Sequence, residues 1–161
     1  METKEIIKHA LKDYQNITGL RSYVVYDNTV IQSASEKNYF CKCLKSSSKA
    51  LKKCEECTEE TYENARKIDH ECVYSCHAGL IKWAVPVQRG DFHCVIVSEG
   101  VLAMKQMEDA DKWAKYLSRE YQLDESMLLK NFKVIQTMDE DQMNASIELL
   151  KDCLLYPSQS P

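Results

Sequence analysis

Cysteine is the residue type whose number and spacing point most directly to chemistry in this chain. The 161 residues include eight cysteines, and six of them lie between positions 41 and 76. Thiolates bind zinc well, and a structural zinc ion usually has four ligands in a tetrahedron. Free cysteine also packs as a small apolar side chain, so the same crowding fits a buried core. Spacing therefore has to be weighed against burial at each position.

Cys54 and Cys57 form a C-x-x-C motif inside a segment with helical periodicity. Residues i and i+3 of a helix lie on adjoining parts of one face, so both sulfurs can approach one point. Cys41 precedes this segment and Cys76 follows it at the end of a predicted strand, which gives the spacing C-x12-C-x2-C-x18-C. The spacing predicts a metal site formed by Cys41, Cys54, Cys57 and Cys76, with zinc expected and iron as the second choice.

The other cysteines, and the metal set itself, have alternative interpretations. Cys43 is the natural substitute for Cys41, because residues two apart in an extended segment point the same way. Cys54 lies on the apolar stripe of its helix, which also fits packing. A thioredoxin-like redox pair is disfavoured, since that motif opens a helix after a strand. We expect three further cysteines to fill the core: Cys72, Cys94 and Cys153.

Hydrophobic periodicity predicts the elements that position these thiols. Strands are expected on both sides of a turn at Asp27-Asn28, and in three runs separated by turns at residues 77–79 and 89–91. Residues 35–47 are polar and irregular. The stripe Leu51, Cys54, Thr58, Thr61, Ala65 and Ile68 should face the core of the second helix. The predicted helices cover residues 3–16, 48–68, 107–122, 124–131 and 139–155.

This order of elements predicts an α+β fold. Two strands, a helical crossover and a three-strand meander make one five-stranded antiparallel sheet with helices on one face, flanked by N- and C-terminal helices. Such a sheet commonly leaves a pocket between its layers. Pro86 cannot donate to a ladder, so it should face an edge or a bulge. We expect one domain over residues 1–156 and a tail or linker over 157–161.

Composition and charge exclude several classes of protein. The net charge is −4 with both signs interspersed, and no basic stripe is present, so we expect no direct contact with nucleic acid. No apolar run approaches the roughly 20 residues that a membrane span needs. The first residues alternate charged and apolar side chains and lack the apolar run of a signal peptide, which favours a cytoplasmic location.

Four segments of the chain together resemble the PocR sensory domain: YFCKCLKSS, CEEC, VYSCHAGLIKWAVPV and GDFHCVIVSEGVL. The run Cys-His-Ala-Gly-Leu at residues 76–80 is the most specific part, and the resemblance covers residues 5–155. It implies a PAS-like ligand-binding domain of bacterial transcription regulators or signalling proteins, with an effector region outside this chain. It implies small hydrocarbon-derived ligands such as propanediol-like alcohols. It also implies that the four cysteines of the metal set occupy the family's cysteine positions.

Four residues are candidates for contact with such a ligand: His77, Tyr74, Trp83 and Glu99. Each also fits a structural role, because a lone tryptophan in a strand more often packs in the core and a histidine at a turn is often structural. Glu99 departs from the resemblance, since many members carry Gly-Gly-Gln or similar in this strand. A pocket-facing Glu99 would favour a cationic ligand, and otherwise the residue is protonated or exposed.

The leading hypothesis is therefore a small-molecule sensor with a structural metal, in which ligand binding shifts the C-terminal helix over residues 139–155. The alternative is a thiolate–metal redox sensor in which the metal site is the signal, with Cys43 or Cys72 as an oxidisable neighbour. An enzyme is disfavoured, because no nucleophile and base pair is evident and four cysteine ligands leave no open coordination position. Flanking helices of this kind favour a homodimer.

Overall fold

The computed structural model describes residues 2–26, 29–30 and 38–155, so the predicted turn at Asp27-Asn28 lies outside the described residues. The five predicted helices and four of the five predicted strands are confirmed within a few residues of their expected ends, whereas the strand expected after the turn is described only at residues 29–30. The helices are α1 (Thr3–Thr18), α2 (Tyr39–Leu44), α3 (Ser48–Ile68), α4 (Met104–Glu108), α5 (Ala110–Tyr121), α6 (Glu125–Phe132) and α7 (Glu140–Leu155). The strands are β1 (Ser22–Tyr26), β2 (Thr29–Val30), β3 (Cys72–Ser75), β4 (Ile81–Arg89) and β5 (Phe92–Ser98).

The strands form an antiparallel sheet in the order β2-β1-β5-β4-β3, which establishes the α+β class. Four strands have four residues or more, whereas β2 contributes a two-residue pairing at the edge. Pro86 lies in β4 opposite Val95, and the pairing of β3 with β4 extends only to Ala84. No described β3 residue therefore pairs with the position where proline lacks an N–H, as expected for this residue.

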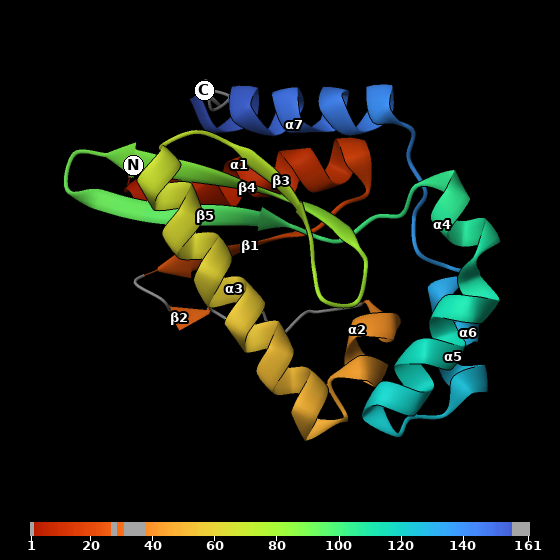
Figure 1. Ribbon diagram of the computed structural model, residues 1–161. Coiled ribbons are helices and arrows are strands. Elements are labelled where there is room, and N and C mark those ends of the chain that lie inside the picture. The colour runs from red at the N-terminus through yellow and green to blue at the C-terminus, as the bar shows by residue number, and fades with distance from the viewer. Residues whose placement is uncertain (1, 27–28, 31–37, 156–161) are drawn as a thin grey trace.

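Helices cover both faces of the sheet, which corrects the prediction of helices on one face. Figure 1 shows α1 and α7 on one side of the strands and α3 on the other. On the α1 and α7 side, Trp83 and Ile96 belong to one buried cluster, whereas Ala84 and Val97 pack with α3 on the opposite side. The reason is that successive residues of β4 and β5 are apolar, and they point to opposite faces. Both faces therefore need cover, as in strands buried on both sides.

Residues 39–44 form a short helix, α2, which corrects the prediction that residues 35–47 are irregular. The side chain of Asn38 caps it by accepting a hydrogen bond from the Cys41 N–H at 3.2 Å. Phe40 and Leu44 lie four residues apart and both are buried. Cys41 and Cys43 are about 200° apart around this helix axis. The argument that Cys43 can replace Cys41 in an extended segment is therefore wrong.

Four short helices form a second group at one end of the sheet, where α2, α4, α5 and α6 gather (Figure 1). The buried side chains of α2, α5 and α6 make one cluster with Ala78 and Leu80 from the turn between β3 and β4, and Met107 of α4 packs against it. The segment before α7 returns to the sheet through a parallel bridge between Leu102 and Thr137. Within the described residues, no helix combines the length and apolar character needed to cross a membrane.

Helix α3 is the element that positions the C-x-x-C motif. Ser47 caps its first turn by accepting a hydrogen bond from the Ala50 N–H at 3.2 Å. Thr61 and Ala65 of the predicted stripe are buried, whereas Ile68 is 48% exposed and does not belong to the core. Tyr62, which is not part of the predicted stripe, is buried and belongs to the core in place of Ile68. The C-x-x-C motif lies in the half of α3 that approaches the end of β3 and its turn.

Candidate functional site

Three polar side chains gather on the face of the sheet beneath α3, and we call them the phenol–lysine group: Tyr23, Tyr74 and Lys82. The ammonium of Lys82 donates a hydrogen bond to the Tyr23 hydroxyl and lies 4.7 Å from the centre of that ring. Tyr74 is the cross-strand partner of Lys82, and its hydroxyl shares a hydrogen bond with Thr61 of α3. The three side chains are partly buried. The Lys82 cation thus lies between sheet and helix, bonded to the Tyr23 hydroxyl and beside Tyr74 on the neighbouring strand.

The electrostatics of this group leave a positive charge on Lys82. Burial disfavours the ammonium, but the neighbouring Tyr23, Tyr74 and Cys76 outweigh it and raise the pKa of Lys82 well above its usual value. Burial also raises the pKa of Tyr23, so the phenol keeps its proton at neutral pH. No ion pair within the described residues involves Lys82. A partly buried cation without a carboxylate partner is uncommon and is often found at functional sites.

The turn after β3 links α3 to α5 through its histidine. His77 Nε2 lies 3.0 Å from Cys54 Sγ, and His77 Nδ1 lies 2.9 Å from the Tyr121 hydroxyl. Burial raises the pKa of the Cys54 thiol to about 11 and lowers the pKa of His77. The thiol therefore donates to a neutral imidazole, whose Nδ1–H donates to Tyr121. The backbone N–H of His77 donates to the sulfur of Cys57.

Helices α4 and α5 hold this turn in place. Trp113 covers Gly79 so closely that a Cβ there would lie 2.9 Å from the indole ring, and Gly79 also has a φ of +89°. The indole N–H of Trp113 donates to the Ala78 carbonyl, and the amide of Gln106 donates to the Gly79 carbonyl at 2.6 Å. Gly79 supplies the positive φ that this turn requires. The Cys-His-Ala-Gly-Leu run is a fixed connector between the sheet and the group of short helices.

The four predicted metal ligands approach one region without forming a site for an ion. Cys54, Cys57 and Cys76 are close enough for each thiol to influence another's ionisation. Among the described residues, however, no three Cys, His, Asp or Glu side chains are arranged so that they could hold a metal. Cys54 instead contacts His77. As placed, these side chains do not fit the tetrahedral four-thiolate shell that a structural zinc requires.

The remaining cysteines behave as the packing interpretation expects. Cys94 is 1% exposed, and Cys72 and Cys153 pack at the edges of buried clusters. Burial raises the pKa of Cys94 to about 12. A thiol that keeps its proton is a poor nucleophile, so these three cysteines are structural.

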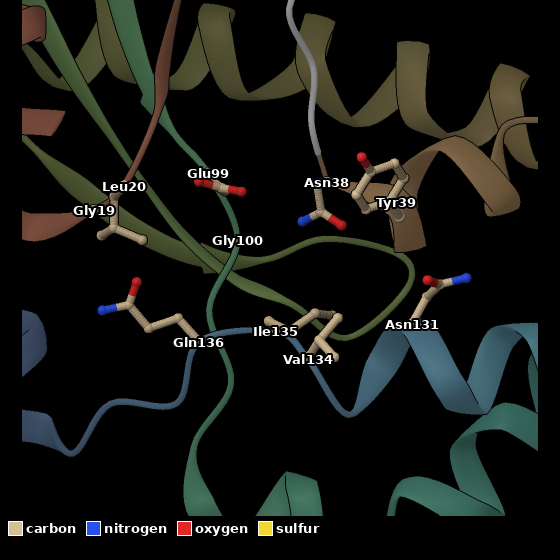
Figure 2. Close-up of a pocket in the computed structure, with 10 residues that line it drawn as sticks. All are labelled: Gly19, Leu20, Asn38, Tyr39, Glu99, Gly100, Asn131, Val134, Ile135 and Gln136. Atoms are coloured by element: carbon tan, nitrogen blue, oxygen red, sulfur yellow. The ribbon is translucent and has the colours of Figure 1, made fainter.

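The four predicted ligand-binding residues lie in three separate places. Tyr74 belongs to the phenol–lysine group, and His77 borders the thiols next to it. Trp83 faces the opposite side of the sheet, where it is fully buried and its indole N–H donates to the Tyr14 hydroxyl at 3.2 Å. Glu99 lines a pocket at the end of β5, away from the phenol–lysine group (Figure 2). The structure therefore brings Tyr74 and His77 near each other and keeps Trp83 and Glu99 apart from them.

Sequence reasoning missed Lys82, Tyr23 and Tyr121. A signal for Lys82 existed, because it is the only charged residue in the apolar run Leu80–Val87. Successive strand residues point to opposite faces, so Lys82 shares a face with Ala84 and not with Trp83. That face is the one that α3 covers. Tyr23 and Tyr121 come from distant segments, and no local pattern connects them to residues 74–82. Only their packing reveals the association.

Comparison with known proteins identifies the family. The model of the family described as "Sensory domain found in PocR" matches residues 3–160, nearly the whole chain, and the chain belongs to this family. No curated protein and no solved structure matches it significantly.

Proposed function

We propose that this domain senses a small hydrocarbon-derived ligand that binds at the phenol–lysine group, between α3 and the sheet. The single observation that carries the proposal is Lys82, a partly buried ammonium that bonds to the Tyr23 hydroxyl beside Tyr74 and has no carboxylate partner among the described residues. Membership of the PocR sensory domain family supports it. So does the architecture, which we propose to be PAS-like because a helical crossover joins the two parts of one antiparallel sheet.

The chemistry of the group favours a ligand with oxygen functions on a short apolar chain. Lys82 supplies N–H donors, and the hydroxyls of Tyr23 and Tyr74 can donate or accept. Ala84 and Val97 lie on the same face, fully buried under α3, and make the surroundings of the group apolar. Few polar contacts that fix orientation, set in an apolar wall, are the usual composition of a small-molecule site. Propanediol-like alcohols have both features.

We propose that ligand binding is transmitted from the sheet to α7. Thr137 before α7 bridges to Leu102 in the segment that follows β5, and the turn carrying His77 is tied to α5 through Tyr121. A ligand shifts such an equilibrium only if it binds the two states with different affinity. The output would be an effector region of a bacterial regulator outside this chain. A cytoplasmic location and a homodimer stay predictions.

Calorimetric titration with propane-1,2-diol and related short diols tests the proposal. Replacing Lys82 by Met keeps much of the side chain's length and removes the charge and the donors. We expect Lys82→Met to weaken binding at least tenfold, a loss of about 1.4 kcal/mol. The matched control is Lys133→Met, because Lys133 is exposed at the end of α6 and should leave binding unchanged. Equal affinity of Lys82→Met and the parent chain for every ligand that binds would overturn this site.

The second candidate function is the thiolate–metal redox sensor, favoured by the gathering of Cys54, Cys57 and Cys76. Zinc would require these side chains to turn, and Cys54 would exchange its contact with His77 for the ion. The raised pKa of Cys54 argues against a free-thiol sensor, since reactive cysteines have lowered values. Metal analysis of the purified protein, before and after mild peroxide, separates the candidates. Stoichiometric zinc lost on oxidation supports the redox sensor, and zinc retained supports a structural ion.

A further inference from the structure

A pocket of about 220 Å3 opens at the end of the sheet, away from the phenol–lysine group. It is bounded by the segment between α1 and β1, the end of β5, the start of α2, and α6 with the segment that follows it (Figure 2). None of its described lining residues belongs to the phenol–lysine group or is a cysteine. The pocket is therefore a second place where a small molecule can bind.

Glu99 is the charged residue of this pocket, and its position is fixed by two hydrogen bonds. The backbone N–H of Glu99 donates to the Arg21 carbonyl at 2.8 Å, and the Arg21 N–H donates to Glu99 Oε2 at 3.0 Å. Glu99 Oε1 has no hydrogen-bond partner within the described residues. Figure 2 shows the carboxylate directed toward the side of the pocket where Asn38 and Tyr39 lie. An oriented carboxylate thus presents one oxygen to the pocket.

The rest of the lining is rich in carboxamides and lacks positive charge among the residues that the structure describes. Asn38, Asn131 and Gln136 line the pocket, and none of the described lining residues is lysine, arginine or histidine. Gln136 donates to the Thr18 carbonyl at 3.4 Å, which leaves its Oε1 as an acceptor on the Gly19 side. The polar atoms therefore favour a cation and disfavour an anion.

The apolar part of the lining limits the size and type of that cation. Leu20 and Ile135 are buried at the base, and Val134 is 73% exposed at the rim. The volume lies below the roughly 300–1,000 Å3 typical of drug-sized ligands. An inorganic ion would leave the apolar wall without contact, and a large ligand would not fit. A short alkyl chain with one ammonium group matches both parts of the lining.

We propose that this pocket is a binding site for a small organic cation, such as a primary alkylammonium, with Glu99 as its counter-ion. The site is independent of the ligand proposed for the phenol–lysine group, since the two share no residue. The ammonium is placed at Glu99 Oε1 and the amide oxygens of Asn131 and Gln136, whose amide N–H groups donate to backbone carbonyls, and the alkyl chain contacts Leu20 and Ile135. Gly100 brings the strand close to Leu80, which fixes the wall of the pocket behind Glu99.

Nuclear magnetic resonance titration of the full chain with three four-carbon probes tests the proposal. The probes are n-butylammonium, 1-butanol and butanoate, which differ in charge at equal chain length. We expect saturable shifts of the Gly19 and Gly100 amides with n-butylammonium only, and at least tenfold weaker binding of the other two. Equal affinity for butylammonium and butanol, or shifts confined to other residues, would overturn the site.

Two variants test whether butylammonium binding depends on the Glu99 carboxylate. Glu99→Gln keeps an oxygen to accept from the Arg21 N–H, so the fold is retained, and should weaken butylammonium binding at least tenfold. Gln136→Glu adds a second carboxylate at an exposed position and should tighten it several-fold. Glu63→Gln on the exposed side of α3 is the matched control and should change nothing. Unchanged binding in both Glu99→Gln and Gln136→Glu contradicts the proposal, even if the diol site is confirmed.

Discussion

The two faces of the sheet differ in chemistry although the same strands form both. On the face covered by α1 and α7, Trp83 and Ile96 are fully buried and the indole has the Tyr14 hydroxyl as partner. On the face covered by α3, Lys82 and Tyr74 are partly buried and surrounded by thiols and hydroxyls. Alternation along β4 sends Trp83 to the first face and Lys82 to the second.

This difference separates the part of the molecule that stabilises the fold from the part that can recognise a ligand. Burial of apolar side chains stabilises the folded state, but such side chains provide no polar group that could bind a ligand. A polar group kept between a sheet and a helix contributes less to stability, because burying a charge costs free energy. We therefore expect substitutions on the face beneath α1 and α7 to lower stability, and substitutions on the face beneath α3 to weaken ligand binding with little change in stability.

The largest effect is expected for Trp83→Ala on the face beneath α1 and α7. Removal of a fully buried tryptophan leaves a cavity and should lower the free energy of unfolding by about 3–5 kcal/mol. Val73, its cross-strand partner, is 55% exposed, so Val73→Ala should cost about 1 kcal/mol or less. Urea unfolding followed by circular dichroism measures both. Similar losses in the two variants would show that this face is not the packed one.

The next effect concerns the turn that carries His77. Gly79→Ala combines a left-handed backbone with a collision against Trp113, so we expect a loss of about 2–3 kcal/mol. Gly90 also has a positive φ, but no described atom lies within 4 Å of the point that a Cβ would occupy, so Gly90→Ala should cost about 1 kcal/mol. Thermal unfolding of the two variants side by side tests the difference. An equal decrease in Tm for Gly79→Ala and Gly90→Ala would show that the close approach of Trp113 to Gly79 adds no cost.

A smaller effect is expected for the pH dependence of stability that His77 causes. Burial, with Lys53 and Lys82 adding to it, lowers the pKa of His77 below its ordinary value of about 6.5. The unfolded chain then binds a proton that the folded chain does not, so stability falls as the pH decreases below about 6.5 and is fully present above it. Unfolding curves from pH 7.5 to 5 should be flatter for His77→Gln than for the parent chain. A parallel slope in both would contradict the shift.

The smallest change in stability is expected for Lys82→Met. Replacing a partly buried charge by an apolar side chain of similar length is often neutral or stabilising, so we expect a change within about 1 kcal/mol. The same variant should lose diol binding, as proposed above. Chemical unfolding and calorimetry on one preparation give both values. A loss of several kcal/mol would mean that Lys82 holds the fold together, and the contrast between the two faces would disappear.

Local sequence patterns determined the elements and their order. Helical periodicity located α3 and α7, alternation located β4 and β5, and the unusual run Cys-His-Ala-Gly-Leu pointed to the family from the residues alone. These predictions succeed because they depend on neighbours in the chain. The short helix α2 was missed, since its two buried residues Phe40 and Leu44 give too little periodicity to be read from the sequence.

Only the tertiary structure decided which residues meet. The sequence grouped Trp83 with Tyr74, but the pleat of β4 and the helices on both faces place them on opposite sides. It also suggested four thiols around one ion, whereas folding pairs Cys54 with His77 and brings Lys82 to Tyr23, 59 positions away. Contacts over such separations depend on how sheet and helices pack, and a single sequence carries no local signal of that packing.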